Sequence, residues 1–132
     1  MRGFKTLKLQ NTVIQKPMHA FVIRVNGKSI GYIQYYNKHD FPPEQGYNTF
    51  SLPDSCGAMD LYIGEKEFCG KGIGTQTISL FLKQHVLKKF DYVFVDPDTK
   101  NFNAINAYSK AGFSIKKQVN ASHVTWMLRS KA

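Results

Sequence analysis

A glycine-rich segment is the first feature of this sequence whose residue types and spacing suggest chemistry. Gly70-Lys71-Gly72-Ile73-Gly74-Thr75 joins a predicted strand at about 58–63 to a predicted helix at about 73–89. Glycines let the backbone approach a ligand closely, and the free amides at the start of a helix bind phosphate oxygens. The segment matches neither the G-x-x-x-x-G-K-S/T pattern of a Walker loop nor the third glycine of a dinucleotide fingerprint. By itself it fits a phosphate site and a turn required only for tight packing equally well.

Two carboxylates occupy positions that a sheet could bring together. Asp60 interrupts an apolar strand, and Asp96 ends the next predicted strand, directly before Pro97. An acid inside an apolar strand favours a functional role for Asp60, whereas Asp96 is equally well explained as a turn cap. A pair of carboxylates would suit a cationic ligand, which the basic remainder of the chain would repel.

Composition bounds the class of protein. The chain has 132 residues, 42% hydrophobic and 20% charged, which predicts one soluble globular domain. Its 18 Lys and Arg against 9 Asp and Glu give a net charge of +9, and the scattered basic residues indicate a solvated surface that attracts polyanions. No apolar run approaches the roughly 20 residues that span a bilayer, and no signal peptide is evident, so a cytoplasmic protein without a membrane segment is expected. Cys56, Cys69 and the four histidines lack the spacing of a zinc or redox site, so no metal is expected.

The predicted elements follow the order β-β-β-α-β-α-β-β. Strands at about 19–25 and 29–36 are joined by Asn26-Gly27, which is typical of a tight hairpin turn. The other strands are expected at about 58–63, 91–96, 113–119 and 122–128, and the helices at about 73–89 and 103–111. A hairpin that feeds a β-α-β unit predicts an α/β (α+β) fold with a mixed, mostly antiparallel sheet and helices packed on it. No repeat or linker divides residues 1–132, which form one predicted domain.

A second motif follows the next strand, so it should open at the same edge of the sheet. Here the sequence resembles the Gcn5-related N-acetyltransferase superfamily, whose acetyl-CoA loop reads R/Q-x-x-G-x-G/A and is followed in many members by N-x-x-A-x-x-x-Y-x-K-x-G-F. Gly72 and Gly74 match the loop, and the second motif is matched by Asn101, Ala104, Tyr108, Lys110, Gly112 and Phe113. Cys69 stands where the family usually has Arg or Gln.

The sequence is most similar to the aminoglycoside 6′-N-acetyltransferases. Four short patterns of that family occur here in order: G-Y-x-Q as Gly31-Tyr32-Ile33-Gln34, an aspartate before apolar residues as Asp60-Leu61-Tyr62-Ile63, G-K-G-x-G-T at 70–75, and D-P-x-x-x-N at 96–101. The resemblance runs from about residue 15 to the end and implies that residues 58–113 form the acetyl-CoA-binding core.

The resemblance also implies roles for individual residues. Asp60 would bind and deprotonate the acceptor amine, Tyr108 would protonate the leaving thiolate, and Asp96 would assist at the acceptor. Tyr47, in the long loop at 37–57, would line the acceptor site. The residues implied in acetyl-CoA binding are Leu61, Tyr62, Ile63, Cys69, Gly70, Lys71, Gly72, Ile73, Gly74, Thr75, Asn101, Ala104, Tyr108 and Lys110. Ordinary roles compete with two of these, because Tyr108 lies on a packed helical stripe and Asn101 precedes a helix that it could cap.

Family members begin with a strand and two helices before the hairpin. Only residues 1–17 precede the hairpin here, and they are interpreted as the remnant of that N-terminal helical region, with the first strand missing. A sheet shortened in this way would expose an edge, which makes a homodimer a hypothesis.

Three functions remain in competition. The first is acetyl-CoA-dependent transfer of an acetyl group to a primary amine of a small cationic acceptor, an aminoglycoside antibiotic, in a resistance-type enzyme. The second keeps this chemistry for a polyamine, another small amine or a protein amine. The third is a non-catalytic basic module that binds a polyanion; the two-part cofactor motif argues against it, and a nucleic-acid partner is not expected.

Overall fold

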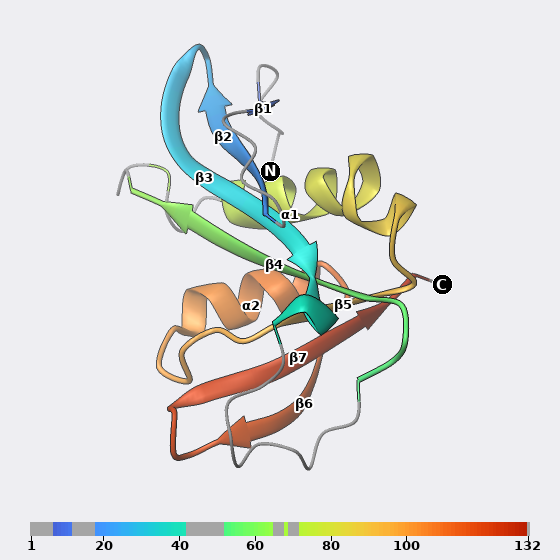
Figure 1. Cartoon of the computed structure of the whole chain (residues 1–132). Helices are drawn as coiled ribbons and strands as arrows, with labels where there is room; N and C mark the ends of the chain where they lie inside the picture. The colour runs from blue at the N-terminus through green and yellow to red at the C-terminus, as the bar shows by residue number, and fades with distance from the viewer. Residues whose placement is uncertain (1–6, 12–17, 42–51, 65–67, 69–71, 132) are drawn as a thin grey trace.

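A single mixed sheet organises the described part of the chain, which in this computed structural model comprises residues 7–11, 18–41, 52–64, 68 and 72–131. Seven strands lie in the order β1-β2-β3-β4-β5-β7-β6 (Figure 1). The strands are β1 Lys8–Asn11, β2 His19–Val25, β3 Lys28–Asn37, β4 Cys56–Ile63, β5 Tyr92–Val95, β6 Ser114–Val119 and β7 Val124–Ser130. The helices are α1 Ile73–Gln84 and α2 Phe102–Lys110, with short 3-10 turns η1 Lys38–Asp40 and η3 Val86–Lys88. The predicted mixed, mostly antiparallel sheet is confirmed.

The hairpin prediction is confirmed as well. β2 and β3 pair antiparallel, from His19 opposite Tyr35 to Val25 opposite Lys28. The two turn residues adopt positive φ angles, 53° at Asn26 and 80° at Gly27. These angles give the turn the twist that matches its flanking strands.

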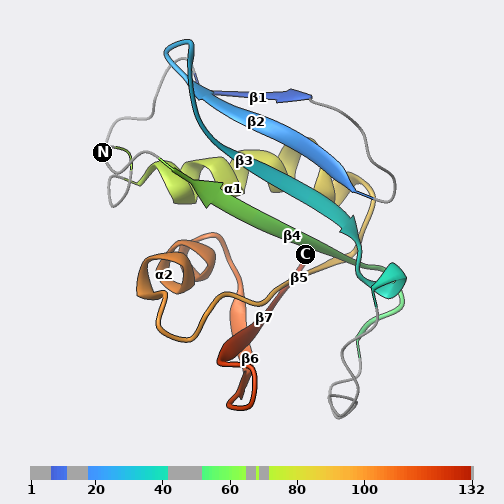
Figure 2. The ribbon, with the colours of Figure 1, turned by 60° about the vertical axis from the view of Figure 1, so that its left-hand side comes forward.

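The parallel pairing of β4 with β5 is short. It covers only Cys56, Gly57 and Ala58, opposite Tyr92, Val93 and Phe94. On its other side β4 stays paired with β3 as far as Ile63. Residues 59–63 of β4 therefore have no ladder partner on the β5 side, and the ribbons of β4 and β5 diverge there with α2 beside the opening (Figures 1 and 2).

The two faces of the sheet carry different side chains, because successive residues of a strand point to opposite faces. Ile33, Met59 and Val93 belong to the main core, which α1 covers with Ile78 and Phe81. A second, smaller core lies on the other face and contains Cys56, Ala58, Phe94, Val119 and Trp126. Asp60 shares the alternation of Ala58, so its carboxylate belongs to the face opposite α1.

The N-terminal interpretation needs correction. The described part of residues 1–17 is a strand rather than a helical remnant: Lys8–Asn11 pairs antiparallel with Phe21–Arg24 of β2. Leu9 packs against the main core, and the pairing gives the β1 backbone hydrogen bonds that four residues could not supply to themselves as a helix. Residues 1–6 and 12–17 lie outside the described part.

One helix boundary also differs from expectation. The helix predicted to reach residue 89 ends at Gln84, where His85 leaves helical geometry with φ −130° and ψ −62°, and a 3-10 turn follows.

No helix among the described residues is long and apolar enough to cross a membrane.

Candidate active site

A row of facing side chains on β3 and β4 begins the site. Antiparallel register places Tyr32 opposite Tyr62, Gln34 opposite Asp60 and Tyr36 opposite Ala58. The side-chain amide of Gln34 donates a 2.9 Å hydrogen bond to Oδ2 of Asp60. Because Asp60 is only half-buried, this bond orients its carboxylate and leaves it reachable from solvent.

Asp96 lies just beyond the end of β5, where its carboxyl senses the charge of Asp60. The pKa of Asp96 is raised above its usual value, first because nearby protein removes part of its hydration and then because Asp60 is negative. Lys38 acts in the opposite direction. The Asp96 residue as a whole remains exposed at the end of β5.

Two phenols complete the cluster. Tyr108 of α2 is only 5% exposed, and its ring packs edge-on against Phe113 at 5.3 Å. Burial raises the pKa of Tyr108 above its usual value, and the charges of Asp60 and Asp96 raise it further. The pKa of Tyr36 is raised by the same causes in the same order. Both phenols are therefore protonated at neutral pH, and the charges of Asp60 and Asp96 act on both of them.

The start of α1 has the backbone geometry expected of the glycine-rich segment. Gly72 occupies the N-cap position with φ 80°, and no side chain caps the helix. A Cβ built on Gly74 would meet Ala107 at 3.9 Å, an ordinary contact distance, so helix packing does not require glycine at that position. This weakens the alternative that the segment serves packing alone. Cys69, Gly70, Lys71 and Tyr47 lie outside the described residues.

The residues of the second motif lie along α2. Oδ1 of Asn101 accepts a 3.1 Å hydrogen bond from the amide of Ala104, so Asn101 caps the helix, as the alternative for it anticipated. Ala104 is half-buried, and Lys110 is exposed at the end of the helix. Of the strand residues predicted to contact the cofactor, Leu61 and Ile63 pack against the main core, whereas Tyr62 is exposed. Ile73 is fully buried and Thr75 half-buried in the first turn of α1.

Sequence reasoning missed two participants. They are Tyr36 of β3 and Lys38 of η1. Nζ of Lys38 donates to the carbonyl of Phe41 at 2.9 Å and lies 5.2 Å from the ring centroid of Phe94. The sequence contained a signal for both residues. Alternation along β3 places Gln34 and Tyr36 on the same face of the sheet, and Lys38 follows directly after the strand.

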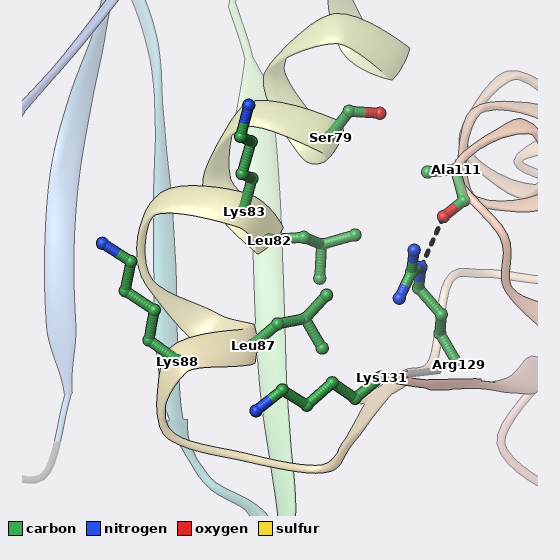
Figure 3. A pocket seen from close by; sticks show the side chains of 8 residues that line it. All are labelled: Ser79, Leu82, Lys83, Leu87, Lys88, Ala111, Arg129 and Lys131. Atoms are coloured by element: carbon green, nitrogen blue, oxygen red, sulfur yellow. Dashed lines mark hydrogen bonds between the residues drawn. The ribbon is translucent and has the colours of Figure 1, made fainter.

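A separate pocket lies away from these residues, beside the second half of α1 (Figure 3). Its volume is about 490 Å³, and its lining residues are Ser79, Leu82, Lys83, Leu87, Lys88, Ala111, Arg129 and Lys131. Nε of Arg129 donates to the carbonyl of Ala111 at 2.8 Å. None of the predicted site residues lines this pocket. The pocket is therefore distinct from the candidate active site around Asp60 and Asp96. Among the described residues, no group of three or more His, Cys, Asp or Glu could hold a metal ion.

The seven-stranded mixed sheet with its two helices is a GNAT-like fold. Residues 5–121 match the model of the acetyltransferase (GNAT) domain family, and the chain belongs to this family.

The individual proteins that the chain resembles have low sequence identity to it. The aminoglycoside N(6′)-acetyltransferase type 1 of Klebsiella pneumoniae is 27% identical over 110 residues, which cover 80% of this chain and 52% of the relative. The chain thus spans about half the length of the curated relatives it matches. The fold also matches the aminoglycoside acetyltransferase AAC(6′)-Ib solved with coenzyme A and kanamycin, with a TM-score of 0.69 and 23% identity over 88% of this chain and 68% of the other. An uncharacterised protein from Bacillus halodurans gives a TM-score of 0.75 at 19% identity, over 89% of this chain and 61% of the other.

Proposed function

We propose that this chain is an acetyl-CoA-dependent N-acetyltransferase that acetylates a primary amine of a small cationic acceptor, most specifically an aminoglycoside. The observation that carries the proposal is the gathering of Asp60, Asp96 and the buried phenol of Tyr108 where β4 and β5 part. Amide formation from a thioester requires an amine that loses a proton and a thiolate that gains one. This cluster contains groups suited to both tasks.

Two features of the chain fit acetyl-CoA. The uncapped amides at the start of α1, behind Gly72, would hold the pyrophosphate. The backbone of β4 at 59–63 has no ladder partner on the β5 side and would bind the amide-bearing arm of the cofactor, as a strand would. When bound, acetyl-CoA supplies an activated acetyl group and a thiolate leaving group.

The side chains of the cluster then have distinct tasks. Asp60, held by Gln34, accepts a hydrogen bond from the acceptor ammonium and takes up its proton, directly or through water. Asp96 adds a second negative charge, which draws a cationic acceptor toward an otherwise basic protein. Tyr108 keeps its phenolic proton at neutral pH and donates it to the departing sulfur.

Two observations support an aminoglycoside as the acceptor. The chain is similar to aminoglycoside acetyltransferases, and the pair of carboxylates suits a molecule with more than one ammonium group. A polyamine or a protein amine remains the competing acceptor. Release of coenzyme A should be assayed with kanamycin, spermidine and a lysine-containing peptide. Turnover of kanamycin at least tenfold above the other two is the expected result, and turnover of spermidine alone would reassign the acceptor.

Cofactor binding is tested separately from turnover. Acetyl-CoA at about a hundred times its dissociation constant should stabilise the fold by about 2.7 kcal/mol, a rise in Tm on the order of several degrees. Inorganic polyphosphate at equal charge serves as the control and should give no comparable rise. No rise with acetyl-CoA would remove the proposed cofactor site and favour a non-catalytic basic module.

A further inference from the structure

Two tyrosine side chains lie in the open beside Asp60. Tyr32 of β3 and Tyr62 of β4 face each other across the ladder and form the pair next to Gln34 and Asp60 on the same face of the sheet. Their ring centroids are 6.1 Å apart and their planes make an angle of 40°. Tyr32 is 44% exposed and Tyr62 is 59% exposed. Neither ring belongs to the group of Asp60, Asp96 and Tyr108 that we assign to proton transfer, and the cofactor role proposed for position 62 uses its backbone rather than its ring.

The ring of Tyr62 lies along its strand rather than projecting straight from it. A Cβ built on Gly64 would lie 3.1 Å from Cε2 and 3.3 Å from Oη of Tyr62. The ring therefore extends over Gly64, on the side away from Asp60, and any side chain at position 64 would displace it. Tyr62 follows Asp60 by two residues on β4, which places their Cα atoms about 7 Å apart. Together with Tyr32, its ring forms an exposed aromatic surface.

This arrangement matches one kind of ligand. An aromatic ring gains from contact with apolar groups and from a cation held near its face, by about 0.5–1 kcal/mol at an exposed site. A saturated ring that carries hydroxyl and ammonium groups offers both, with an apolar C–H face and a rigid shape that loses little conformational entropy on binding. A flexible linear amine loses more entropy on the same surface.

We infer that Tyr32 and Tyr62 form a subsite for a saturated, ammonium-bearing ring of the acceptor, adjacent to the amine held at Asp60. The inference rests on the proposed function for the identity of the neighbouring group, and it adds that the subsite selects amino-sugar rings over linear polyamines. Tyr62 contributes the contact through its ring rather than through its hydroxyl group.

Equilibrium binding tests the subsite without requiring catalysis. Kanamycin and spermidine are titrated by calorimetry into the whole chain in the presence of coenzyme A. The variants are Tyr62→Ala, Tyr62→Phe and, as a matched control, Tyr92→Ala, which removes a tyrosine that is 36% exposed at the start of β5. We expect Tyr62→Ala to weaken kanamycin binding about tenfold and spermidine binding less than twofold. Tyr62→Phe and Tyr92→Ala should each change kanamycin binding less than twofold.

Several results would overturn the subsite. These are kanamycin binding within twofold of wild type in Tyr62→Ala, an equal loss for spermidine, an equal loss in Tyr92→Ala, or no kanamycin binding by the wild-type chain. Failure of the proposed function has a different signature, because kanamycin would then bind with the expected dependence on Tyr62 and no acetyl group would be transferred. Unchanged Tm values for the exposed-site variants confirm that each is folded.

Discussion

Gln34 and Asp60 are directly opposite each other on β3 and β4, and the amide of Gln34 donates a 2.9 Å hydrogen bond to the carboxylate. The bond fixes the Asp60 carboxylate from one side while solvent reaches the other. Gln34 is thus a positioning residue for the proposed acceptor site, and it accounts physically for the glutamine of the G-Y-x-Q pattern.

Replacing Gln34 should affect the acceptor rather than the cofactor. We expect Gln34→Leu to lower kcat/KM for the amine about tenfold, because a carboxylate that loses its neutral donor no longer holds one orientation. Steady-state kinetics with the amine varied measures this effect, and acetyl-CoA affinity should stay within twofold. Gln118→Leu, at an exposed position of β6, is the matched control. Equal losses in both variants would contradict a positioning role.

Asp60 itself should matter more than the residue that orients it. Asp60→Asn keeps the size of the side chain and removes its ability to accept a proton, so we expect a loss in kcat of at least about 10². Acetyl-CoA binding, followed by thermal shift, should be nearly unchanged. Turnover close to wild type would exclude Asp60 as the base.

Tyr108→Phe removes only the hydroxyl group, whose proton we assign to the leaving thiolate. Because general acids typically contribute about 10²–10⁴ in rate, kcat should fall about 10² while the KM for the amine changes little. The Tm should change by only a few degrees, since the ring and its contact with Phe113 remain. Tyr92→Phe provides the control for loss of an exposed hydroxyl. Wild-type kcat in Tyr108→Phe would leave the ring with a packing role alone.

The buried phenols should make the fold sensitive to alkali. The pKa values of Tyr36 and Tyr108 are raised in the folded chain, whereas both are about 10 in the unfolded chain. Above pH 10 the unfolded chain therefore binds fewer protons than the folded one, so the free energy of unfolding falls as pH rises. Urea unfolding at pH 8, 9, 10 and 10.5 should show this fall. It should be shallower in Tyr36→Phe/Tyr108→Phe, and equal slopes in the two proteins would contradict the assignment.

The glycine of the G-Y-x-Q pattern, Gly31, has a steric explanation. A Cβ at position 31 would lie 2.0 Å from the backbone oxygen of Tyr62, which cannot move without breaking the β3–β4 ladder. We expect Gly31→Ala to destabilise the fold by about 3 kcal/mol. Gly27→Ala, where the added Cβ has open space but φ is 80°, should cost only about 1 kcal/mol. Equal shifts in urea midpoint for the two variants would contradict this steric explanation.

The sequence predicts those features of the fold and of the candidate site that depend on residues close together in the chain. Asn26-Gly27 defines its hairpin with adjacent residues alone. The common face of Asp60 and Asp96 was within reach because both carboxylates follow the alternation of neighbouring parallel strands. Lys8–Asn11 was out of reach, since Leu9 is its one apolar residue and its pairing depends on the free edge of β2.

The electrostatic part of the site was equally hidden. The sequence predicts Tyr108 as a core residue on a helical stripe. In the fold, β4 diverges from β5, and the charges of Asp60 and Asp96 act on the buried phenol of Tyr108. That divergence follows from where a three-residue ladder stops, which no local pattern encodes. The role proposed for Tyr108 follows from the resemblance of the two motifs to the acetyltransferase family, whereas its environment follows from the fold.

The short pairing of β4 with β5 also divides the molecule into cooperative units of unequal strength. β1 to β4 and β5 to β7 are each held by antiparallel ladders between neighbouring strands, whereas three parallel positions and the α1 core connect the two groups. Local opening should therefore begin at this junction, at a free energy below that of global unfolding. Such opening separates Asp60 from Asp96 while leaving both groups of strands intact. We expect mild denaturant to abolish acetyl transfer before the far-ultraviolet circular dichroism signal of the strands changes.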